Sequence, residues 1–160
     1  MQDAGRIYEQ HADAVRAYVR RRAAPDLVED VVADVFVVCV RRIAEVPRDP
    51  LPWLYGVARK TLANERRRRA HAVELAGEVA HEPEPAGDGA LARAFAALSG
   101  DDREVLRLVA WEGLALRDAA VVLGCSAVAC RVRYHRAKSR LRALLDAPAP
   151  FRPEPEGVTR

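Results

Sequence analysis

The stretch GLALRDAAVVLGCSAVACRVRYHRAKSRLRALL, residues 113–145, has the pattern of two helices joined by a tight turn. The first predicted helix spans Leu116–Leu123, and Gly124 follows it, where a sharply turning helix end often needs a positive φ. Ser126 is a good N-cap for the second helix, because its hydroxyl can accept an otherwise unpaired backbone N–H. This stretch therefore predicts a helical hairpin with a defined turn.

The second predicted helix of this hairpin has two distinct faces. The residues that we expect to pack inward, at helical spacing, are Cys130, Tyr134, Ala137, Leu141 and Leu144. A different face carries Arg131, Val132, His135, Arg136 and Ser139. No acidic residue lies between positions 119 and 145, whereas six basic residues lie within positions 131–142. The pattern predicts a helix-turn-helix, which enters a DNA major groove; the alternative is a helical hairpin with a solvated basic face.

Length, cysteine content and the N-terminal sequence limit the class of protein. The 160 residues suffice for one or two small domains, and the net charge of +3 is mild. Cys125 and Cys130 with His135 match no common zinc pattern, so we interpret these cysteines, with Cys39, as buried thiols and expect no metal or cofactor. Neither an apolar signal core nor a run of about 18 apolar residues occurs, which predicts a reduced, cytoplasmic protein without membrane insertion.

The first half of the chain predicts two helices separated by Pro25. Residues 7–22 carry an apolar stripe of Tyr8, His11, Val15, Tyr18 and Val19. We expect the following arginines, at positions 20–22, to be solvated. Asp26 and Glu29 have the D-x-x-E spacing of a capping arrangement for the second helix.

The segment DVVADVFVVCVRR, residues 30–42, is so rich in valine that a strand is a competing interpretation. We favour a helix because the cap precedes it, the run exceeds ordinary strand length, and no partner strand is evident. A helix would place Asp30, Ala33, Asp34 and Arg41 on one exposed face. The simplest explanation of that face is solvation, and composition alone does not exclude it.

A proline-rich loop and a basic helix follow. Residues 43–52 contain three prolines and predict a stiff loop, after which Trp53 opens a third helix. The apolar stripe of that helix consists of Leu54, Val57, Ala58, Thr61 and Leu62. The other face carries Arg59, Lys60, Asn64 and Arg67, and the helix ends in four arginines at positions 66–69. Because the polar face is already basic, we favour nucleic-acid binding over a merely solvated helix end.

The remaining segments define the domain organisation. Residues 71–89 are acidic and end in a Pro/Gly cluster, which predicts a flexible linker. Residues 90–98 predict a short helix, Ser99 and Gly100 interrupt it, and Asp101-Asp102 start another. We therefore predict an all-α fold of two small helical domains, residues 1–70 and 90–146, followed by a Pro-rich tail at 147–160.

Three segments of the chain, in order, are similar to segments of one family. EDVVADVF (residues 29–36) resembles a polymerase-clamp-binding segment, and PWLYGVARKTLANERRRR (residues 52–69) resembles a segment that opens the promoter −10 element. Residues 98–141 resemble a −35-binding domain almost throughout. The chain therefore resembles an extracytoplasmic function (ECF, group 4) RNA polymerase sigma factor of the sigma-70 family. One such motif would be weak support, but three in order are specific.

This resemblance implies a fold, partners and site residues. The two domains would be a sigma-2 helical bundle and a sigma-4 helix-turn-helix, and the partners would be promoter DNA, the β′ clamp helices and β flap of core RNA polymerase, and possible anti-sigma factors. The implied core-polymerase residues are Asp30, Asp34 and Arg41. The implied −10 residues are Arg48, Trp53, Arg59, Lys60, Asn64, Arg66 and Arg67. The implied −35 residues are Ser126, Arg131, Val132, Arg133, His135 and Arg136.

The chain also departs from the family pattern. Ala33 stands where glutamine is usual in the clamp segment, and Lys60 and Asn64 stand where Asn and Asp are common. Val132 replaces a common serine and cannot hydrogen-bond through its side chain, so it would contact a thymine methyl or leave a position unread. These departures affect specificity or strength and leave the class unchanged.

Two other functions are weaker alternatives. The chain could be a stand-alone helix-turn-helix regulator that dimerises through its first half, but a dimerisation domain needs neither four terminal arginines nor an acidic linker between basic modules. An enzyme is disfavoured, because the sequence has no carboxylate pair, metal cluster, nucleophile–histidine set or glycine-rich phosphate loop. The resemblance is therefore the favoured interpretation, and it implies a non-enzymatic promoter-specificity subunit that helps to melt the −10 region.

Overall fold

The computed structural model describes residues 3–75 and 89–147, and these two ranges are helical with no strand. The predicted all-α class is therefore confirmed. In the first range, the α-helices are α1 (Ala4–Arg20), α2 (Val28–Arg41) and α3 (Leu51–Leu75). In the second range, they are α4 (Ala90–Ala96), α5 (Gly100–Ala110), α6 (Leu116–Leu123) and α7 (Ala127–Asp146). Short 3-10 turns at Pro25–Leu27 and Ile43–Glu45 connect the first three helices.

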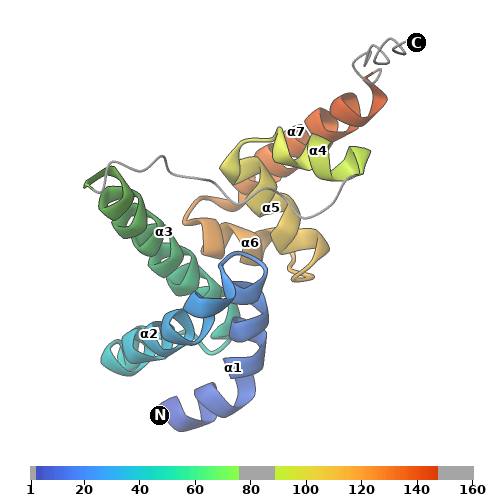
Figure 1. The fold of residues 1–160 in the computed structure, drawn as a ribbon. Helices are drawn as coiled ribbons and strands as arrows, with labels where there is room; N and C mark the ends of the chain where they lie inside the picture. Colours follow the sequence, from blue (N-terminus) through green and yellow to red (C-terminus); the bar gives the residue numbers. More distant parts are fainter. Residues whose placement is uncertain (1–2, 76–88, 148–160) are drawn as a thin grey trace.

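Helices α1, α2 and α3 pack against one another as a three-helix bundle (Figure 1). Its fully buried side chains include Val15, Tyr18, Val35 and Leu54, so every helix contributes to the core. Asp3 caps α1 by accepting a 2.9 Å hydrogen bond from the backbone N–H of Gly5.

Helix α1 shows two differences from the sequence-based expectation. The apolar stripe includes Ile7, which is buried, whereas Tyr8 is 46% exposed and contacts the ring of Phe36 edge-on. The arginines at positions 20–22 are not all solvated, because Arg22 is buried against acidic residues of the second range. Its partners lie more than 80 positions away, where no local pattern could reveal them.

Helix α2 is confirmed as a helix, but its predicted cap is wrong. Leu27 occupies the N-cap position without a side-chain hydrogen bond, because Pro25 starts a 3-10 turn there instead. Asp26 pairs with Arg69 at 2.9 Å, and Glu29 pairs with Arg16 at 2.9 Å. Both acids therefore connect helices rather than capping one.

Helix α3 is longer at both ends than expected. It begins at Leu51, so Pro52 lies in the first turn, where its missing N–H breaks no intrahelical hydrogen bond. Its other end passes the arginine run and reaches Leu75, which makes the first five residues of the predicted linker helical. The rest of that linker, residues 76–88, and the tail from residue 148 onward lie outside the described residues.

The second domain is built around α7, which packs against α4, α5 and α6. Ser99 caps α5, its hydroxyl accepting a 3.2 Å hydrogen bond from the N–H of Asp102. The core of this domain includes Val105, Leu108 and Ala119, all fully buried.

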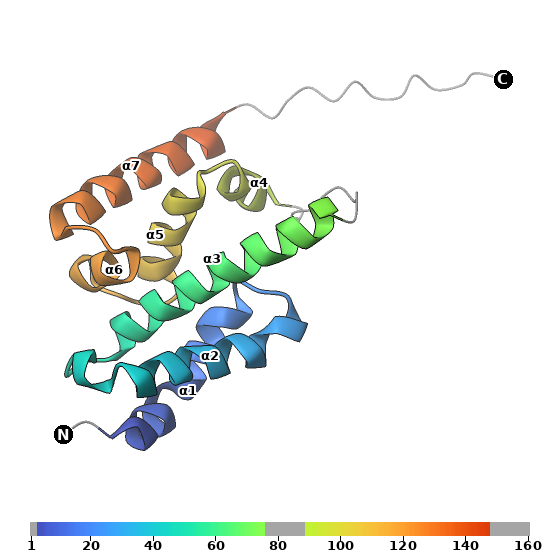
Figure 2. The ribbon, with the colours of Figure 1, turned by 90° about the vertical axis from the view of Figure 1, so that its left-hand side faces the viewer.

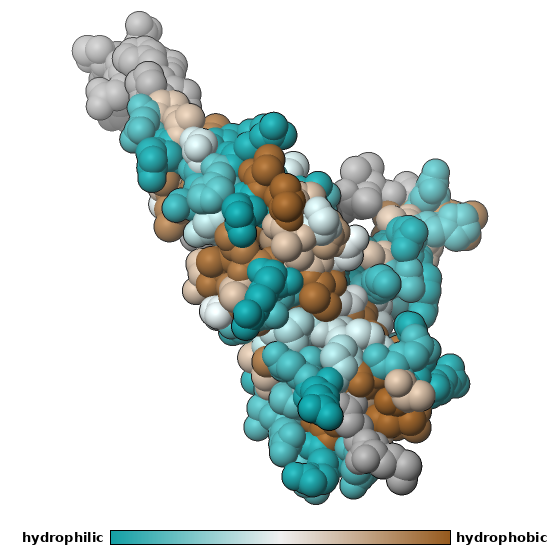
Figure 3. Space-filling model, turned by 180° about the vertical axis from the view of Figure 1, so that it is seen from behind, coloured by the Kyte–Doolittle hydropathy of each residue, from teal (hydrophilic) through white to brown (hydrophobic). Residues whose placement is uncertain are grey.

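The two domains are docked through α3 and α6. Figure 2 shows α3 lying between α2 and the second domain. Gly56 of α3 faces α6 so closely that a Cβ on it would lie 3.7 Å from the carbonyl oxygen of Val121. On the face seen from behind in relation to Figure 1, hydrophilic residues predominate and hydrophobic residues form separate patches (Figure 3).

Candidate nucleic-acid interface

The turn between α6 and α7 has the predicted geometry. Gly124 adopts the left-handed conformation, with φ 66° and ψ 34°, and ends α6. Ser126 caps α7 by accepting a 3.1 Å hydrogen bond from the N–H of Ala129. The prediction of a helix-turn-helix at this position is confirmed, and its two helices have a fixed relative orientation.

The inward face of α7 follows the prediction except at its end. Cys130 and Ala137 are fully buried, and Tyr134 and Leu141 are half-buried. Leu144 was expected to pack inward but is 36% exposed, because it lies in the last turns of α7 beyond those contacts. The packed part of α7 is thus its N-terminal two-thirds, which is the part next to the turn.

The outward face of α7 is exposed and makes few contacts with the rest of the described chain. Arg131, Val132, His135 and Arg136 are all exposed. Among the residues that the structure describes, neither arginine forms an ion pair, and His135 only touches the neighbouring ring of Tyr134. We name these four residues the reading face. Arg131 and Arg136 could therefore form hydrogen bonds without first breaking an ion pair to a described residue.

Two other basic residues of α7 point toward α5 instead. Arg133 is half-buried and lies 3.7 Å from the carboxylate of Asp101. Arg140 donates a 2.5 Å hydrogen bond to Asp102. The basic residues of α7 therefore divide into a free reading face and an internally paired group.

The basic face of α3 has more internal contacts. Arg59 bonds to Asp101 at 3.2 Å, Arg66 donates to the backbone carbonyl of Arg22 at 3.0 Å, and Arg67 donates to Asn64 at 2.6 Å. Lys60 is exposed. These residues lie on one helix, as predicted. The three arginines, however, donate their hydrogen bonds to other groups of the protein.

The start of α3 carries the other predicted −10 residues. Trp53 is half-buried in its first turn, and the guanidinium of Arg42 lies 5.8 Å from its ring centroid. Arg48 is exposed in the short connection before α3. The loop thus places a planar aromatic ring and two cations at the same end of the helix.

Asp101 was missed by the sequence reasoning, which treated it only as a helix start. One of its carboxylate oxygens accepts from Arg59 of α3, and the other faces Arg133 of α7. A single acid therefore neutralises one cation on each candidate DNA-binding helix. The only signal in the sequence was the pair of acids at the start of α5.

Helix α2 presents the face expected for a protein partner. Asp30, Asp34 and Arg41 are exposed as predicted. Between them, at helical spacing, Val37 is 45% exposed and Val40 is 59% exposed. Sequence reasoning missed these two valines, although the segment holds more valines than one inward face requires.

The comparisons with known proteins agree with this arrangement. The family model described as Sigma-70 region 2 matches residues 7–72, and that described as Sigma-70, region 4 matches residues 88–141. RNA polymerase sigma factor CnrH of Cupriavidus metallidurans is 34% identical, over 89% of this chain and 86% of the relative. The chain belongs to the sigma-70 family, as a sigma factor of the ECF type.

Other similar proteins support the same assignment. ECF sigma factor EcfG of Rhodopseudomonas palustris is 31% identical over 76% of this sigma factor and 71% of its own length. Sigma factor RpoE of Bartonella quintana, solved with the anti-sigma factor NepR, superposes with a TM-score of 0.69 at 25% identity, covering 93% of this chain and all of that one. CnrH, solved with the cytosolic domain of CnrY, gives 0.64 at 30% identity, covering 91% and 89%.

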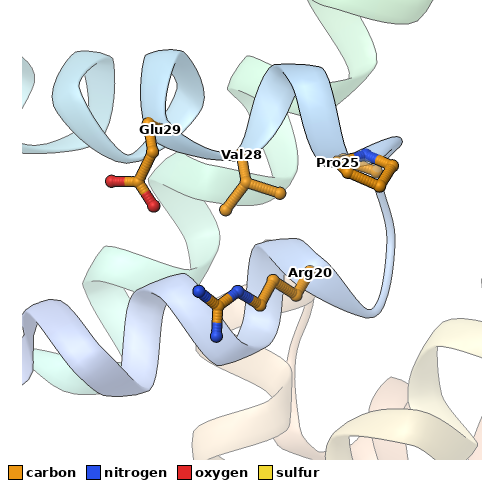
Figure 4. Close-up of a pocket in the computed structure, with 5 residues that line it drawn as sticks. Arg20, Pro25, Val28 and Glu29 are labelled. Carbon is orange, nitrogen blue, oxygen red and sulfur yellow. The ribbon is translucent and has the colours of Figure 1, made fainter.

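The remaining described features of this sigma factor are a small pocket and buried thiols. A pocket between α1 and α2 is lined by Arg20, Pro25, Val28 and Glu29, as Figure 4 shows, and Glu29 is already paired with Arg16. Burial raises the pKa of the Cys39 and Cys130 thiols. Within residues 3–75 and 89–147, no group of three His, Cys, Asp or Glu could hold a metal ion, and no helix has the length and apolarity to cross a membrane.

Proposed function

We propose that this sigma factor binds core RNA polymerase and directs initiation at a promoter with separate −35 and −10 elements. The observation that carries the proposal is the reading face of α7, which is exposed, unpaired and held by a capped turn. A second basic helix, α3, lies in a different domain of the same chain. Two such helices suit a promoter with two elements.

At the −35 element, α7 would enter the major groove. Arg131 and Arg136 can each bond bidentately to guanine, and Val132 can contact only a thymine methyl. Ser126 is exposed at the N-terminus of α7, where backbone N–H groups favour a phosphate. Arg133 lies at the margin of the reading face and would hold the DNA backbone, once it leaves Asp101.

At the −10 element, the loop before α3 and the helix itself would capture an opened strand. Unstacking a base costs a few kcal/mol, which binding must offset because a sigma factor has no ATP. The ring of Trp53 offers a stacking surface, and Arg48 lies close to it in sequence. Further along α3, a row of polar side chains would follow the phosphates, consisting of Arg59, Lys60, Asn64, Arg66 and Arg67.

The exposed face of α2 would bind the β′ clamp helices of the polymerase, and the second domain would bind the β flap. Protein interfaces typically have an apolar centre surrounded by polar groups. On α2, Val37 and Val40 would form that centre, and Asp30, Asp34 and Arg41 would form the polar surround. This apolar centre compensates for Ala33, which lacks the usual polar group.

An anti-sigma factor is a further partner of this proposal. The similar proteins RpoE and CnrH were solved in complex with the anti-sigma factor NepR and with the cytosolic domain of CnrY. We extend this kind of partner to the present chain. All these roles are binding roles, so the sigma factor is proposed to act without an active site of its own.

Run-off transcription with purified core polymerase tests the proposal. Adding the protein should produce transcripts that core enzyme alone does not make. Val37→Asp with Val40→Asp should abolish these transcripts, because it places charge in the proposed apolar contact. Leu75→Asp is the control: it also places charge on an exposed apolar residue, 76% exposed, but outside that contact, and should not abolish them. No added transcript on any genomic template would refute the proposal, and binding to a single DNA site without transcription would favour a stand-alone regulator.

A further inference from the structure

Two exposed valines lie near the start of α7, on the side of the helix that faces away from the core of the second domain. Val128 is 70% exposed and Val132 is 42% exposed, and the two are about one helical turn apart. With 3.6 residues per turn, Val128 lies about 160–180° around the helix from Cys130 and Ala137, the buried residues of α7. We call Val128 and Val132 the valine pair, which lies opposite the buried side of α7.

Neither burial nor helix propensity explains valine at these two positions. An exposed side chain gains little from the hydrophobic effect, and valine is a poorer helix former than alanine because its branched side chain is restricted against the preceding turn. The exposed positions on either side of Val128 are alanines, Ala127 and Ala129. One exposed valine would be ordinary. Two on the same face, each at a cost in helix propensity, indicate a contact with another molecule.

The charges around the valine pair indicate what kind of surface it contacts. Arg131 and Arg136 are exposed, and helical geometry places them on opposite sides of the pair around α7. No acidic residue lies between positions 119 and 145. The partner should therefore carry negative charge on both sides of an apolar group. The major groove of DNA has this arrangement, because thymine 5-methyl groups lie on its floor between two phosphate backbones.

The position of Val128 along α7 favours contact with bases over contact with the DNA backbone. In helix-turn-helix proteins, the N-terminal residues of the second helix contact base edges. Val128 is the second residue of α7, directly after the turn that Ser126 caps. Valine is short, so the helix backbone must approach the bases closely, and the small side chains of Ala127 and Ala129 leave room for that approach.

The spacing and chemistry of the valine pair limit the bases that it can accept. Four residues of α-helix rise about 6 Å, and successive base pairs of a duplex are about 3.4 Å apart. The two valines therefore match base pairs that are one or two steps apart. Cytosine at such a position would place its amino group against an apolar side chain and leave that donor without a partner, which disfavours it. Thymine presents a methyl group there instead.

We propose that the valine pair is a specificity determinant of this sigma factor, which selects thymines on two nearby base pairs of the −35 element by contact with their 5-methyl groups. The proposal rests on the proposed function and deepens it, because it names bases that α7 accepts in addition to those read by Arg131 and Arg136. Val128, which sequence reasoning did not single out, contacts one of the two thymines. Val132 contacts the other.

Removing only the methyl group from the DNA tests the proposal. Holoenzyme, assembled from the full chain and core polymerase, first selects a −35 element from promoter DNA that is randomised in that segment. Each thymine of the selected duplex is then replaced by uracil, which pairs identically but lacks the 5-methyl group. At two positions, one or two steps apart, the affinity of wild-type holoenzyme should fall roughly 4-fold, as expected for the loss of one buried methyl group.

Variants of the protein assign each methyl group to its valine. Val128→Ala should remove the effect of uracil at one of the two positions, and Val132→Ala should remove it at the other. Alanine is the better helix former, so both variants should fold. Leu145→Ala is the control, because it shortens a 41% exposed apolar residue of the same helix outside the valine pair, and it should retain both effects.

Two results on the DNA would overturn the proposal: a selected element in which every thymine tolerates uracil, or an effect of uracil that Val128→Ala leaves unchanged. Loss of transcription in Val128→Ala without loss of DNA binding would assign the valine to a protein partner and would also overturn it. All three results leave the proposed function intact, because the holoenzyme still selects a −35 element. Failure of wild-type holoenzyme to select any −35 sequence would refute the proposed function, and this proposal with it.

Discussion

The two basic helices, α3 and α7, differ in what their side chains contact. On α7, Arg131 and Arg136 are exposed and, within the described residues, have no ionic partner. On α3, Arg59, Arg66 and Arg67 all bond to acceptors of the protein itself. Sequence alone makes the helices look alike, since both are rich in arginine. The structure shows that, within the described residues, the arginines on the outward face of α7 lack ionic partners, whereas those on the basic face of α3 are bonded to the protein.

This difference fits the two tasks that we propose. Reading a duplex requires a rigid helix with free side chains, because the major groove is already open. Capturing a melted strand requires contacts that form late, after the DNA has been distorted. Internal partners on α3 would delay those contacts and reduce non-specific binding by the free protein. The following predictions test this contrast.

The largest effect should come from removing a free arginine of α7. Arg136→Ala should cost about 1–3 kcal/mol, or roughly 5- to 150-fold in affinity, at one base position of the −35 element. Binding of holoenzyme to a set of single-base promoter variants measures this loss. Arg142→Ala is the matched control, as an exposed arginine of the same helix outside the reading face. A uniform loss over all sequences for Arg136→Ala would mean that Arg136 contacts only phosphate.

A smaller effect of opposite sign should come from Asp101. Asp101→Asn frees Arg59 and Arg133, which are held through partly exposed ion pairs worth about 0.2–1 kcal/mol each. DNA affinity should therefore rise roughly 2-fold, and at most about 30-fold if both pairs are at the upper limit, and it should fall more steeply with added salt. Asp146→Asn removes the same charge at the exposed end of α7 and should change affinity less. Equal effects of the two variants would show that only net charge matters.

The smallest effect should concern the anchoring of the end of α3. The hydrogen bond from Arg69 lowers the pKa of Asp26 from its ordinary value of 3.8, so the folded state favours the carboxylate. This stabilisation is present above pH 3.8 and is lost as the pH falls through the lowered pKa. Asp26→Asn should slightly reduce Tm at pH 7, and the difference from wild type should disappear in acid. A difference that persisted at low pH would assign the effect to something other than this ion pair.

The sequence predicted those features that depend on neighbouring residues. Gly124 and Ser126 specified the helix-turn-helix, because a left-handed residue and an N-cap act within one turn. Helical spacing identified the buried positions of α7 and the exposed acids of α2. Where a local signal competed with a partner distant in the sequence, the prediction was wrong. Asp26 and Glu29 have the spacing of a cap, but Arg69 and Arg16 bind them instead.

The docking of the domains could not be predicted from local patterns. Arg22 contacts Glu104 and Glu112, which lie 82 and 90 positions away, and each of these residues resembles ordinary surface charge in the sequence. The same reason explains why Asp101 was missed. The predicted inward face of α1 was also wrong by one residue at its start, because Ile7 is buried and Tyr8 is exposed. Motif position in the chain was enough to name the candidate DNA-binding residues. Whether each side chain is free of internal partners depends on three-dimensional contacts.

The central claim is that α7 holds the −35 element while α3 opens the −10 element, in one complex. Permanganate footprinting of the holoenzyme on a promoter, combined with nuclease protection, measures both events together. The account predicts reactive, unpaired thymines at −10 and protection at −35 on the same DNA. It also predicts that Trp53→Ala removes the reactivity and leaves the protection. Protection at −35 with no reactive thymine near −10 in the wild-type complex would contradict it.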